Sequence, residues 1–263
     1  DLRLHCNVVA NDPAHAYLEK ITTQEQRQLV KNMRLSLVIP CYNEVAHLPT
    51  LLSRCAEVAE PSEVEVILVD NGSTDDTPLL LMELLPHYPG CRSIRVERNL
   101  GYGHGIVSGL RAAKGAILGW THADLQTDPL DAQRGLAIFE THKEILVKGR
   151  RCGRPINDVF FTVGMSIFET LLLGRPMWDI NAQPTLFPRT FFETWHKPPK
   201  DFSLDLYVYY QAIRAGLPVR RFPVQFGERL HGVSHWNVDW ASKRKFIRRT
   251  VYFSLQLRRN CRK

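Results

Sequence analysis

Short apolar runs alternate with longer amphipathic stretches over the first 150 residues or so of the chain. The apolar runs have the length and β-branched content of strands, and we expect strands at 35–40, 64–70, 93–97, 116–120 and 144–149. The stretches between them predict helices at 45–60, 77–85, 103–113 and 130–142. Strands and helices that alternate in this way form a mostly parallel sheet with helices on both faces. The pattern therefore predicts an α/β fold.

The alternation becomes irregular after Arg150. In this half we expect helices at 159–173, 203–215 and 240–259, a short strand within 179–189, a strand at 217–226 and a polar loop at 228–236. Before the first strand, 14–32 has the pattern of an amphipathic helix that follows Pro13. The fold is thus expected to carry a helical appendage at each end.

Three of the expected strands end abruptly in polar residues. The first leads into Tyr42-Asn43-Glu44, the second ends at Asp70, and the one at 116–120 leads into H-A-D-L-Q, residues 122–126. The carboxyl ends of parallel strands lie along one edge of a sheet, where α/β proteins bind ligands. These three ends together predict a site for a nucleotide diphosphate and a metal ion.

Asp124 is the main candidate for a metal ligand. Mg²⁺ is usually held by one or two carboxylates together with substrate phosphates. A metal at this position would neutralise the charge that builds up on a departing nucleoside diphosphate. The alternatives are a carboxylate that caps the helix after Pro129 and a solvated loop acid.

Four motifs occur in order along this half of the chain. They are P-C-Y-N-E at 40–44, V-D-N-G-S-T-D-D-T at 69–77, N-L-G-Y-G-H-G at 99–105 and A-D-L-Q-T-D-P at 123–129. In this order they resemble family 2 glycosyltransferases of the GT-A fold. The resemblance is to the branch that contains dolichol-phosphate mannose synthase and related polyprenyl-phosphate sugar transferases, and it extends from Arg34 to Trp240.

The resemblance implies a nucleotide-sugar site, for a UDP- or GDP-sugar, and a divalent metal, Mg²⁺ or Mn²⁺. The matching positions of the donor site are Pro40, Tyr42, Glu44, Asp70, Gly101, His122, Asp124, Arg150, Arg229 and Ser234. The matching metal positions are Asp124, Gln126 and His122. Arginines also suit phosphate by their own chemistry, because the guanidinium presents a planar fork of donors, although most arginines are simply surface charges.

His122 departs from the family pattern. The resembling proteins have D-A-D-L-Q where this chain has H-A-D-L-Q. Asp124 is then left as the main metal ligand. A histidine in the first position could bind a softer ion such as Mn²⁺ or contact the diphosphate.

Asp205 matches an acid that the family places near the acceptor, and it is the second expected catalytic residue beside Asp124. Such a carboxylate can deprotonate an attacking hydroxyl. An acceptor phosphate is already ionised, so with that acceptor Asp205 would orient or hold the sugar. The alternative is that Asp205 has no catalytic role and is simply an acid that the helix dipole favours at a helix N-terminus. The resemblance also implies acceptor binding by Asn181, Gln183 and His235.

One feature weakens the match to a lipid-phosphate acceptor. Members of that branch usually carry a further arginine in the helix that corresponds to 159–173, and this helix contains none.

With the resemblance, we expect a GT-A domain at 34–239, divided into a nucleotide-sugar half (34–150) and an acceptor half (151–239). An N-terminal helical appendage (1–33) and a basic amphipathic helix (240–263) would flank it.

The chain has a net charge of +7, but nine basic and no acidic residues lie between Lys243 and Lys263, so the rest of the chain is slightly acidic. Apolar Ile247, Val251 and Leu257 lie on one side of the expected last helix and most basic residues on the other. A helix on an anionic membrane surface and a docked helix with a solvated basic face both fit this pattern. Nucleic-acid binding is not expected, because no motif for it is present.

Composition supports an intracellular, membrane-peripheral protein. The six cysteines have no C-x-x-C spacing, as in reduced thiols. No apolar run reaches the ~20 residues that span a bilayer, and the first residues lack a signal pattern. We expect a cytoplasmic protein at the membrane face.

The sequence thus predicts a metal-dependent, inverting transfer of a sugar from a nucleotide-sugar to a polyprenyl phosphate. Two alternatives remain open: transfer to a sugar hydroxyl of a surface polysaccharide or glycan with Asp205 as base, and a non-catalytic nucleotide-sugar-binding protein, which His122 keeps possible. A dinucleotide-dependent oxidoreductase is disfavoured, because no G-x-G-x-x-G follows the first strand.

Overall fold

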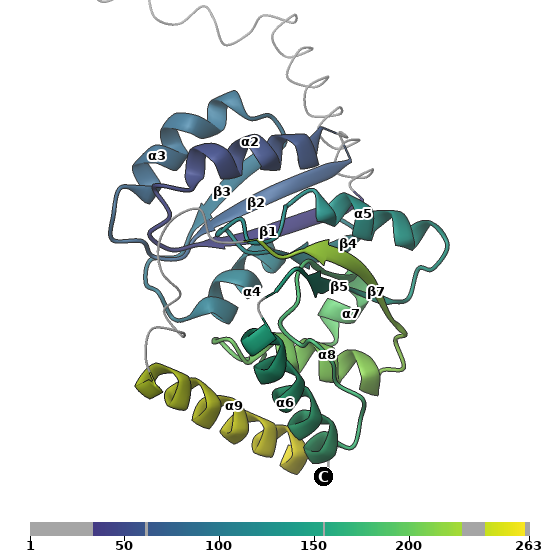
Figure 1. The fold of residues 1–263 in the computed structure, drawn as a ribbon. Helices are drawn as coiled ribbons and strands as arrows, with labels where there is room; N and C mark the ends of the chain where they lie inside the picture. The colour runs from purple at the N-terminus through teal and green to yellow at the C-terminus, as the bar shows by residue number, and fades with distance from the viewer. Residues whose placement is uncertain (1–33, 61–62, 155, 228–239, 261–263) are drawn as a thin grey trace, which may run out of the picture.

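The computed structural model describes residues 34–60, 63–154, 156–227 and 240–260. In this part of the chain the strands form one sheet of seven, in the order β3-β2-β1-β4-β6-β5-β7 (Figure 1). They are β1 (Leu35–Cys41), β2 (Val64–Asp70), β3 (Cys91–Arg95), β4 (Ile117–Trp120), β5 (Leu146–Cys152), β6 (Thr185–Pro188) and β7 (Val219–Gln225). The predicted helix at 14–32 and loop at 228–236 lie outside the described residues.

Helices cover both faces of the sheet, as predicted. They are α2 (Leu48–Ala59), α3 (Thr77–Leu84), α4 (Tyr102–Ala112), α5 (Asp131–Ala137), α6 (Ile156–Leu173), α7 (Arg189–Glu193), α8 (Leu204–Arg214) and α9 (Trp240–Asn260), with 3₁₀ turns η1 (Leu85–His87) and η2 (Ile138–Glu140). On one face, Leu52 of α2 and Leu136 of α5 join the same buried cluster. On the other, Leu110 of α4 and Val208 of α8 join a second cluster. β2 is buried at every position, as expected for a strand covered on both faces.

The structure confirms the expected α/β fold and differs mainly at element ends. β3 lies two residues earlier than predicted, and β5 ends three residues later. The helix predicted at 45–60 begins at Leu48, because the residues before it form a turn in which His47 N donates to Glu44 O. The helices predicted at 77–85 and 130–142 end in 3₁₀ turns. The short helix α7 was not predicted.

Strand β6 runs antiparallel to both of its neighbours, whereas every other pairing in the sheet is parallel. Its Thr185 pairs with Trp120 of β4 and with Lys148 of β5. Because β6 runs in the opposite direction, its first residue lies at the edge where the parallel strands end. The loop that precedes β6, which contains Gln183, is therefore brought to that edge.

Helix α9 packs against α6 at one end of the molecule (Figure 1). Ser254 Oγ donates to Glu169 Oε1 over 2.7 Å, and both side chains are buried, as is Leu257. Arg244 and Arg248 are exposed. The side of α9 that carries Leu257 is thus docked on the protein and its basic side is solvated. None of the described helices is long and apolar enough to span a bilayer.

Candidate functional site

The loops that follow β1 and β2 are joined by Asn43. Its φ of 57° lies in the left-handed region, which asparagine tolerates better than most residues. Its backbone N donates to Ser73 Oγ over 3.1 Å, and its side-chain oxygen accepts from Thr74 N over 2.9 Å. The turn that carries Tyr42 and the strand end that carries Asp70 therefore form one ordered edge.

Asp70 is buried at this edge with one oxygen satisfied inside the protein. Its Oδ1 accepts from Ser73 N over 2.9 Å. In the part of the chain that the structure describes, no hydrogen-bond donor reaches Oδ2, although Arg95 Nε lies 3.5 Å away. A buried carboxylate oxygen without a donor is unfavourable. Oδ2 is thus suited to accept from an N–H of a base or a ribose hydroxyl.

The glycine segment serves chain packing. Gly101 has φ 118°, and a Cβ on it would lie 2.4 Å from Lys200 O; a Cβ on Gly103 would lie 2.5 Å from Pro199 O. These two glycines therefore admit the backbone of 199–201, the segment before α8. The close contacts of these glycines are with the protein's own backbone, and donor binding by Gly101 stays a prediction. The segment is also tied to β2, because Asn71 Nδ2 donates to Gly101 O over 3.1 Å.

The H-A-D-L-Q segment follows β4 and places Asp124 at the same edge as Asp70. Asp124 is buried, and its Oδ1 accepts from Gln126 N over 3.2 Å. Gln126 also binds the chain after β7: Gly227 N donates to Gln126 O over 2.8 Å, and Gln126 Nε2 donates to Gly227 O over 3.3 Å. Arg229, Ser234 and His235, which follow Gly227, lie outside the described residues.

His122 belongs to an aromatic stack that the sequence did not indicate. Its ring lies 5.5 Å from that of Tyr102, which in turn stacks on Phe202 at 4.5 Å. Burial, together with the charges of Asp205 and Asp124, raises the pKa of Tyr102 well above its usual value. The stack thus connects His122, through Tyr102, to Phe202 in the segment before α8.

Asp205 lies in the first turn of α8 and is 2% exposed. Gln183 Nε2 donates to its Oδ1 over 2.7 Å, and Lys148 Nζ lies 3.8 Å from the same oxygen. Burial raises the pKa of Asp205, while Lys148 and His122 oppose that shift. The structure thus brings the predicted Asp205 and Gln183 together. The predicted Asn181 is exposed, and its role stays a prediction.

Lys148 is the residue that sequence reasoning missed. It is 1% exposed, and its Nζ donates to Thr185 Oγ1 over 2.6 Å. Burial lowers the pKa of Lys148 to about 8, although Asp205 opposes the shift. A charged residue within the apolar run I-L-V-K-G is the signal that could have found it.

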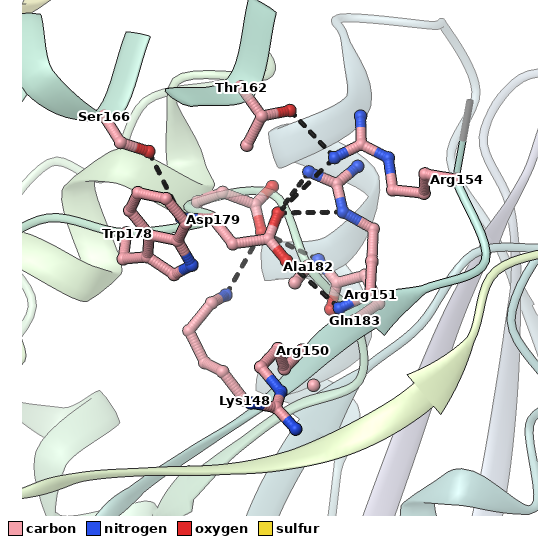
Figure 2. Close-up of polar contacts among 12 residues, drawn as sticks. Lys148, Arg150, Arg151, Arg154, Thr162, Ser166, Trp178, Asp179, Ala182 and Gln183 are labelled. Carbon is pink, nitrogen blue, oxygen red and sulfur yellow. Dashed lines mark hydrogen bonds and ion pairs between the residues drawn. The ribbon is translucent and has the colours of Figure 1, made fainter. Parts of the chain in front are cut away.

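Arginines surround a second buried carboxylate beside Lys148. Figure 2 shows Arg151 and Arg154 converging on Asp179, whereas Arg150 points away from it. Arg151 Nε donates to Asp179 Oδ1 over 2.9 Å, and Arg154 Nη1 lies 4.0 Å from that oxygen. Both guanidinium groups also lie over the ring of Phe226. Burial would raise the pKa of Asp179, but Arg151 outweighs it and holds that pKa below its usual value.

The possible metal ligands at this edge fit an ion that a substrate diphosphate would also bind. Among the described residues, no group of three or more His, Cys, Asp and Glu side chains could by itself hold an ion. Asp124, with His122 two residues before it, offers a carboxylate and an imidazole at the strand edge. Such a partial set suits Mg²⁺ or Mn²⁺, which complete their coordination with phosphate oxygens and water.

The profile of the family described as Glycosyl transferase family 2 matches residues 36–204. The chain belongs to this family. The family match confirms the resemblance seen in the sequence motifs, and it excludes the alternative of a dinucleotide-dependent oxidoreductase.

Similar curated proteins are polyprenyl-phosphate sugar transferases. One is a dodecaprenyl-phosphate galacturonate synthase of Rhizobium johnstonii, 32% identical over 56% of this chain and 44% of the relative. Another is an undecaprenyl-phosphate 4-deoxy-4-formamido-L-arabinose transferase of Serratia proteamaculans, 31% identical over 61% and 50%. The chain therefore spans about half the length of these relatives. A dolichyl-phosphate beta-glucosyltransferase of Dictyostelium discoideum is 24% identical over 78% and 69%.

Similar solved structures share the fold. Glucosyl-3-phosphoglycerate synthase of Mycobacterium tuberculosis, in complex with Mn²⁺, UDP and glucosyl-3-phosphoglycerate, has a TM-score of 0.65 at 20% identity, over 89% of this chain and 83% of that one. A mannosyltransferase of Pyrobaculum calidifontis, in complex with GDP-Man and Mn²⁺, has a TM-score of 0.59 at 20% identity, over 83% and 66%. The expected GT-A architecture is confirmed by these likenesses.

We predict that Asp70→Ala weakens nucleoside diphosphate binding by about 10- to 100-fold, the worth of a hydrogen bond to a charged group. The loss should appear with the free nucleoside diphosphate in calorimetry, because Asp70 is predicted to bind the nucleoside part. Asp70→Asn, which keeps an acceptor for Ser73 N, separates binding from loop order. Asp76→Ala, in the same loop and exposed, is the matched control. Equal affinity of Asp70→Ala and wild type would show that the carboxylate has no such role.

We predict that His122→Asp restores the family motif and shifts the preferred metal from Mn²⁺ toward Mg²⁺, because a second carboxylate is a harder ligand than an imidazole. The measurement is donor binding and turnover across a series of Mg²⁺ and Mn²⁺ concentrations. His122→Phe, which can keep the ring stack on Tyr102 but offers no ligand, is the control. A folded His122→Asp protein without any activity would instead show that the imidazole has a task of its own.

Proposed function

We propose that this chain transfers a sugar from a nucleotide-sugar to a polyprenyl phosphate, in a metal-dependent reaction that inverts the anomeric centre. The observation that carries the acceptor class is the surplus of positive charge beside Asp205 and Gln183. Among the described residues, the cations there are Lys148, Arg151 and Arg221, and the carboxylates that face them are Asp179 and Asp205. A surplus of cations at the C-terminal end of β5 is suited to an anionic acceptor.

The donor lies, in this proposal, across the ends of β1, β2 and β4. Asp70 Oδ2 accepts from the nucleoside, Pro40, Tyr42 and Glu44 line it, and Asp124 faces the diphosphate. A divalent metal held by Asp124, with Gln126 and His122 beside it, would neutralise charge on the leaving diphosphate. Mn²⁺ with UDP or GDP-Man in the structurally similar enzymes supports this assignment.

The reaction needs no base when the acceptor is a phosphate. An ionised phosphate oxygen forms a bond to the anomeric carbon while the bond from that carbon to the diphosphate breaks. The nucleoside diphosphate leaves with the bonding electron pair, and attack from the opposite side inverts the centre. Asp205, held by Gln183, then binds sugar hydroxyls. The acceptors in the names of the similar curated proteins, which are dodecaprenyl, undecaprenyl and dolichyl phosphate, support this choice.

Transfer to a sugar hydroxyl is the second candidate, and one observation favours it. Burial raises the pKa of Asp205, which makes the carboxylate a better proton acceptor. The two candidates are separated by product: incubation with radiolabelled UDP- and GDP-sugars should yield an organic-extractable product with a short polyprenyl phosphate. Label in a water-soluble glycan alone would favour the hydroxyl acceptor, and donor binding without turnover of either kind would leave only a binding protein.

We also propose that α6 and α9 rest on an anionic membrane surface. Apolar side chains of α6 are exposed at helical spacing along one side: Ile156, Val159, Phe160, Ile167 and Leu171. Exposed arginines of α9, which packs on α6, lie at the same end of the molecule: Arg244, Arg248, Arg258 and Arg259 (Figure 1). Apolar side chains beside basic ones suit the boundary between acyl chains and anionic headgroups. A polyprenyl phosphate would be reached from such a surface.

We predict that Asp124→Ala abolishes sugar transfer and metal-dependent donor binding without unfolding the protein, because it removes the carboxylate assigned to the metal. Donor affinity with and without Mn²⁺ is measured by calorimetry, and the fold by circular dichroism. Asp128→Ala is the matched control, since Asp128 lies in the same loop but pairs with Arg54. Unchanged turnover of Asp124→Ala at saturating donor and metal would remove Asp124 from the mechanism.

We predict that Phe160→Ser with Leu171→Ser lowers co-sedimentation with phosphatidylglycerol vesicles by about tenfold or more, because two exposed apolar anchors are lost. The control pair is Leu79→Ser with Met82→Ser, which removes equally exposed apolar side chains from α3. Binding of the wild type should also fall with salt, since attraction is screened within about 10 Å at 0.1 M. A wild type that ignores the vesicles would end the membrane proposal while leaving the transfer proposal standing.

A further inference from the structure

Lys148 is buried in the middle of the site, where an ammonium group is unfavourable unless it is paired. It lies on β5, between β6 and β7 in the sheet. Its ladder partners are Thr185 on one side and Arg221 on the other. A residue fixed by two ladders has little backbone freedom, so its side chain presents a charge at a defined point.

The ammonium of Lys148 has two partners at that point. It donates to Thr185 Oγ1 over 2.6 Å and lies 3.8 Å from Asp205 Oδ1. Gln183 Nε2 donates to the same Oδ1 over 2.7 Å. Gln183 and Lys148 thus both approach one oxygen of Asp205, Oδ1. A carboxylate held in this way is fixed in rotation.

We propose that Lys148 is a positioning residue: anchored by Thr185, it holds the Asp205 carboxylate in the orientation that binds the transferring sugar. The proposal rests on the sugar-transfer function proposed above. The proposal goes beyond that function because it assigns a role to Lys148 and makes Asp205 a paired carboxylate that orients the sugar. A hydroxyl-activating base would need a carboxylate that can gain a proton, which a neighbouring ammonium opposes.

The opposite charges of the two partners support the ionised form of the pair, whereas burial opposes it. Asp205 is faced by Lys148 and Arg151 of β5 and by His122 after β4. Lys148 is faced by Asp205 of α8, Asp179 of the loop before β6, Arg221 of β7 and Arg151. Burial lowers the pKa of Lys148 to about 8, so the ammonium is present below pH 8 and is lost as the pH rises through that value. Turnover should therefore fall on the alkaline side of pH 8.

Lys148→Met, which keeps the length of the side chain and removes its charge, tests the proposal. We expect kcat to fall by about 100-fold, as for a misplaced catalytic group, while the Kd for the nucleoside diphosphate stays unchanged. The alkaline fall near pH 8 should disappear in this variant. The matched control is Arg220→Met, which removes an exposed cation from the neighbouring strand and should leave kcat and its pH profile unchanged.

A double-variant cycle separates positioning from a merely structural role. If Lys148 acts through Asp205, then Lys148→Met with Asp205→Asn should have the kcat of Asp205→Asn alone. Additive losses would overturn the proposal, as would a Lys148→Met protein with wild-type kcat. Lys148→Met alone could fail to fold because Asp205 is left unpaired. The double variant carries neither charge, so comparing its kcat with that of Asp205→Asn still tests the proposal.

Donor hydrolysis, followed with the donor and metal alone, distinguishes this proposal from the proposed function. Loss of hydrolysis in Lys148→Met supports the positioning role even if no polyprenyl phosphate is glycosylated by the wild type. A wild type that glycosylates polyprenyl phosphate, together with a fully active Lys148→Met protein, would retain the function and refute the role of Lys148.

Discussion

The site depends on a single reversal of direction in the sheet, the entry of β6 antiparallel between β4 and β5. A strand in this direction delivers its preceding loop, not its following one, to the edge where the parallel strands end. Two glycines make room for it: a Cβ on Gly119 would lie 2.6 Å from Thr185 O, and one on Gly149 would lie 2.2 Å from Gln183 O. The reversal is what places Gln183 beside Asp205 at this edge.

The charges buried at this edge are difficult to explain by stability. Lys148 with Asp205 and Arg151 with Asp179 each remove two ions from water, and replacing such pairs by apolar side chains of similar volume is often neutral or stabilising. A core built only for stability would not hold two such pairs around one strand end. Their placement is better explained by the binding of a charged or hydroxyl-rich ligand, to which fixed charges present defined hydrogen-bond partners.

The sequence predicted those parts of the site that local patterns mark. Asp70 and Asp124 each follow an apolar run, so their position at the sheet edge could be inferred from parallel topology, and Asp205 and Gln183 were reached through the family resemblance. Lys148 could not be inferred in this way. Its burial depends on Thr185, far along the chain, covering it from β6. The packing partners of the glycines at 101 and 103 could not be inferred for the same reason, since the residues at 199–201 leave no local signal.

The C-terminal helix is connected to the site by a short series of contacts. Arg249 Nε lies 3.3 Å from Asp201 Oδ2, and its guanidinium lies over Phe202, whose ring stacks on Tyr102. Tyr102 stacks on His122, which lies two residues before Asp124. Contiguous contacts alone do not establish coupling, which needs an element with two arrangements. The segment 199–203 is held by Arg249 of α9 on one side and by the glycines at 101 and 103 on the other, and it leads directly into Asp205. The contacts of α9 thus help to fix the segment that leads into Asp205.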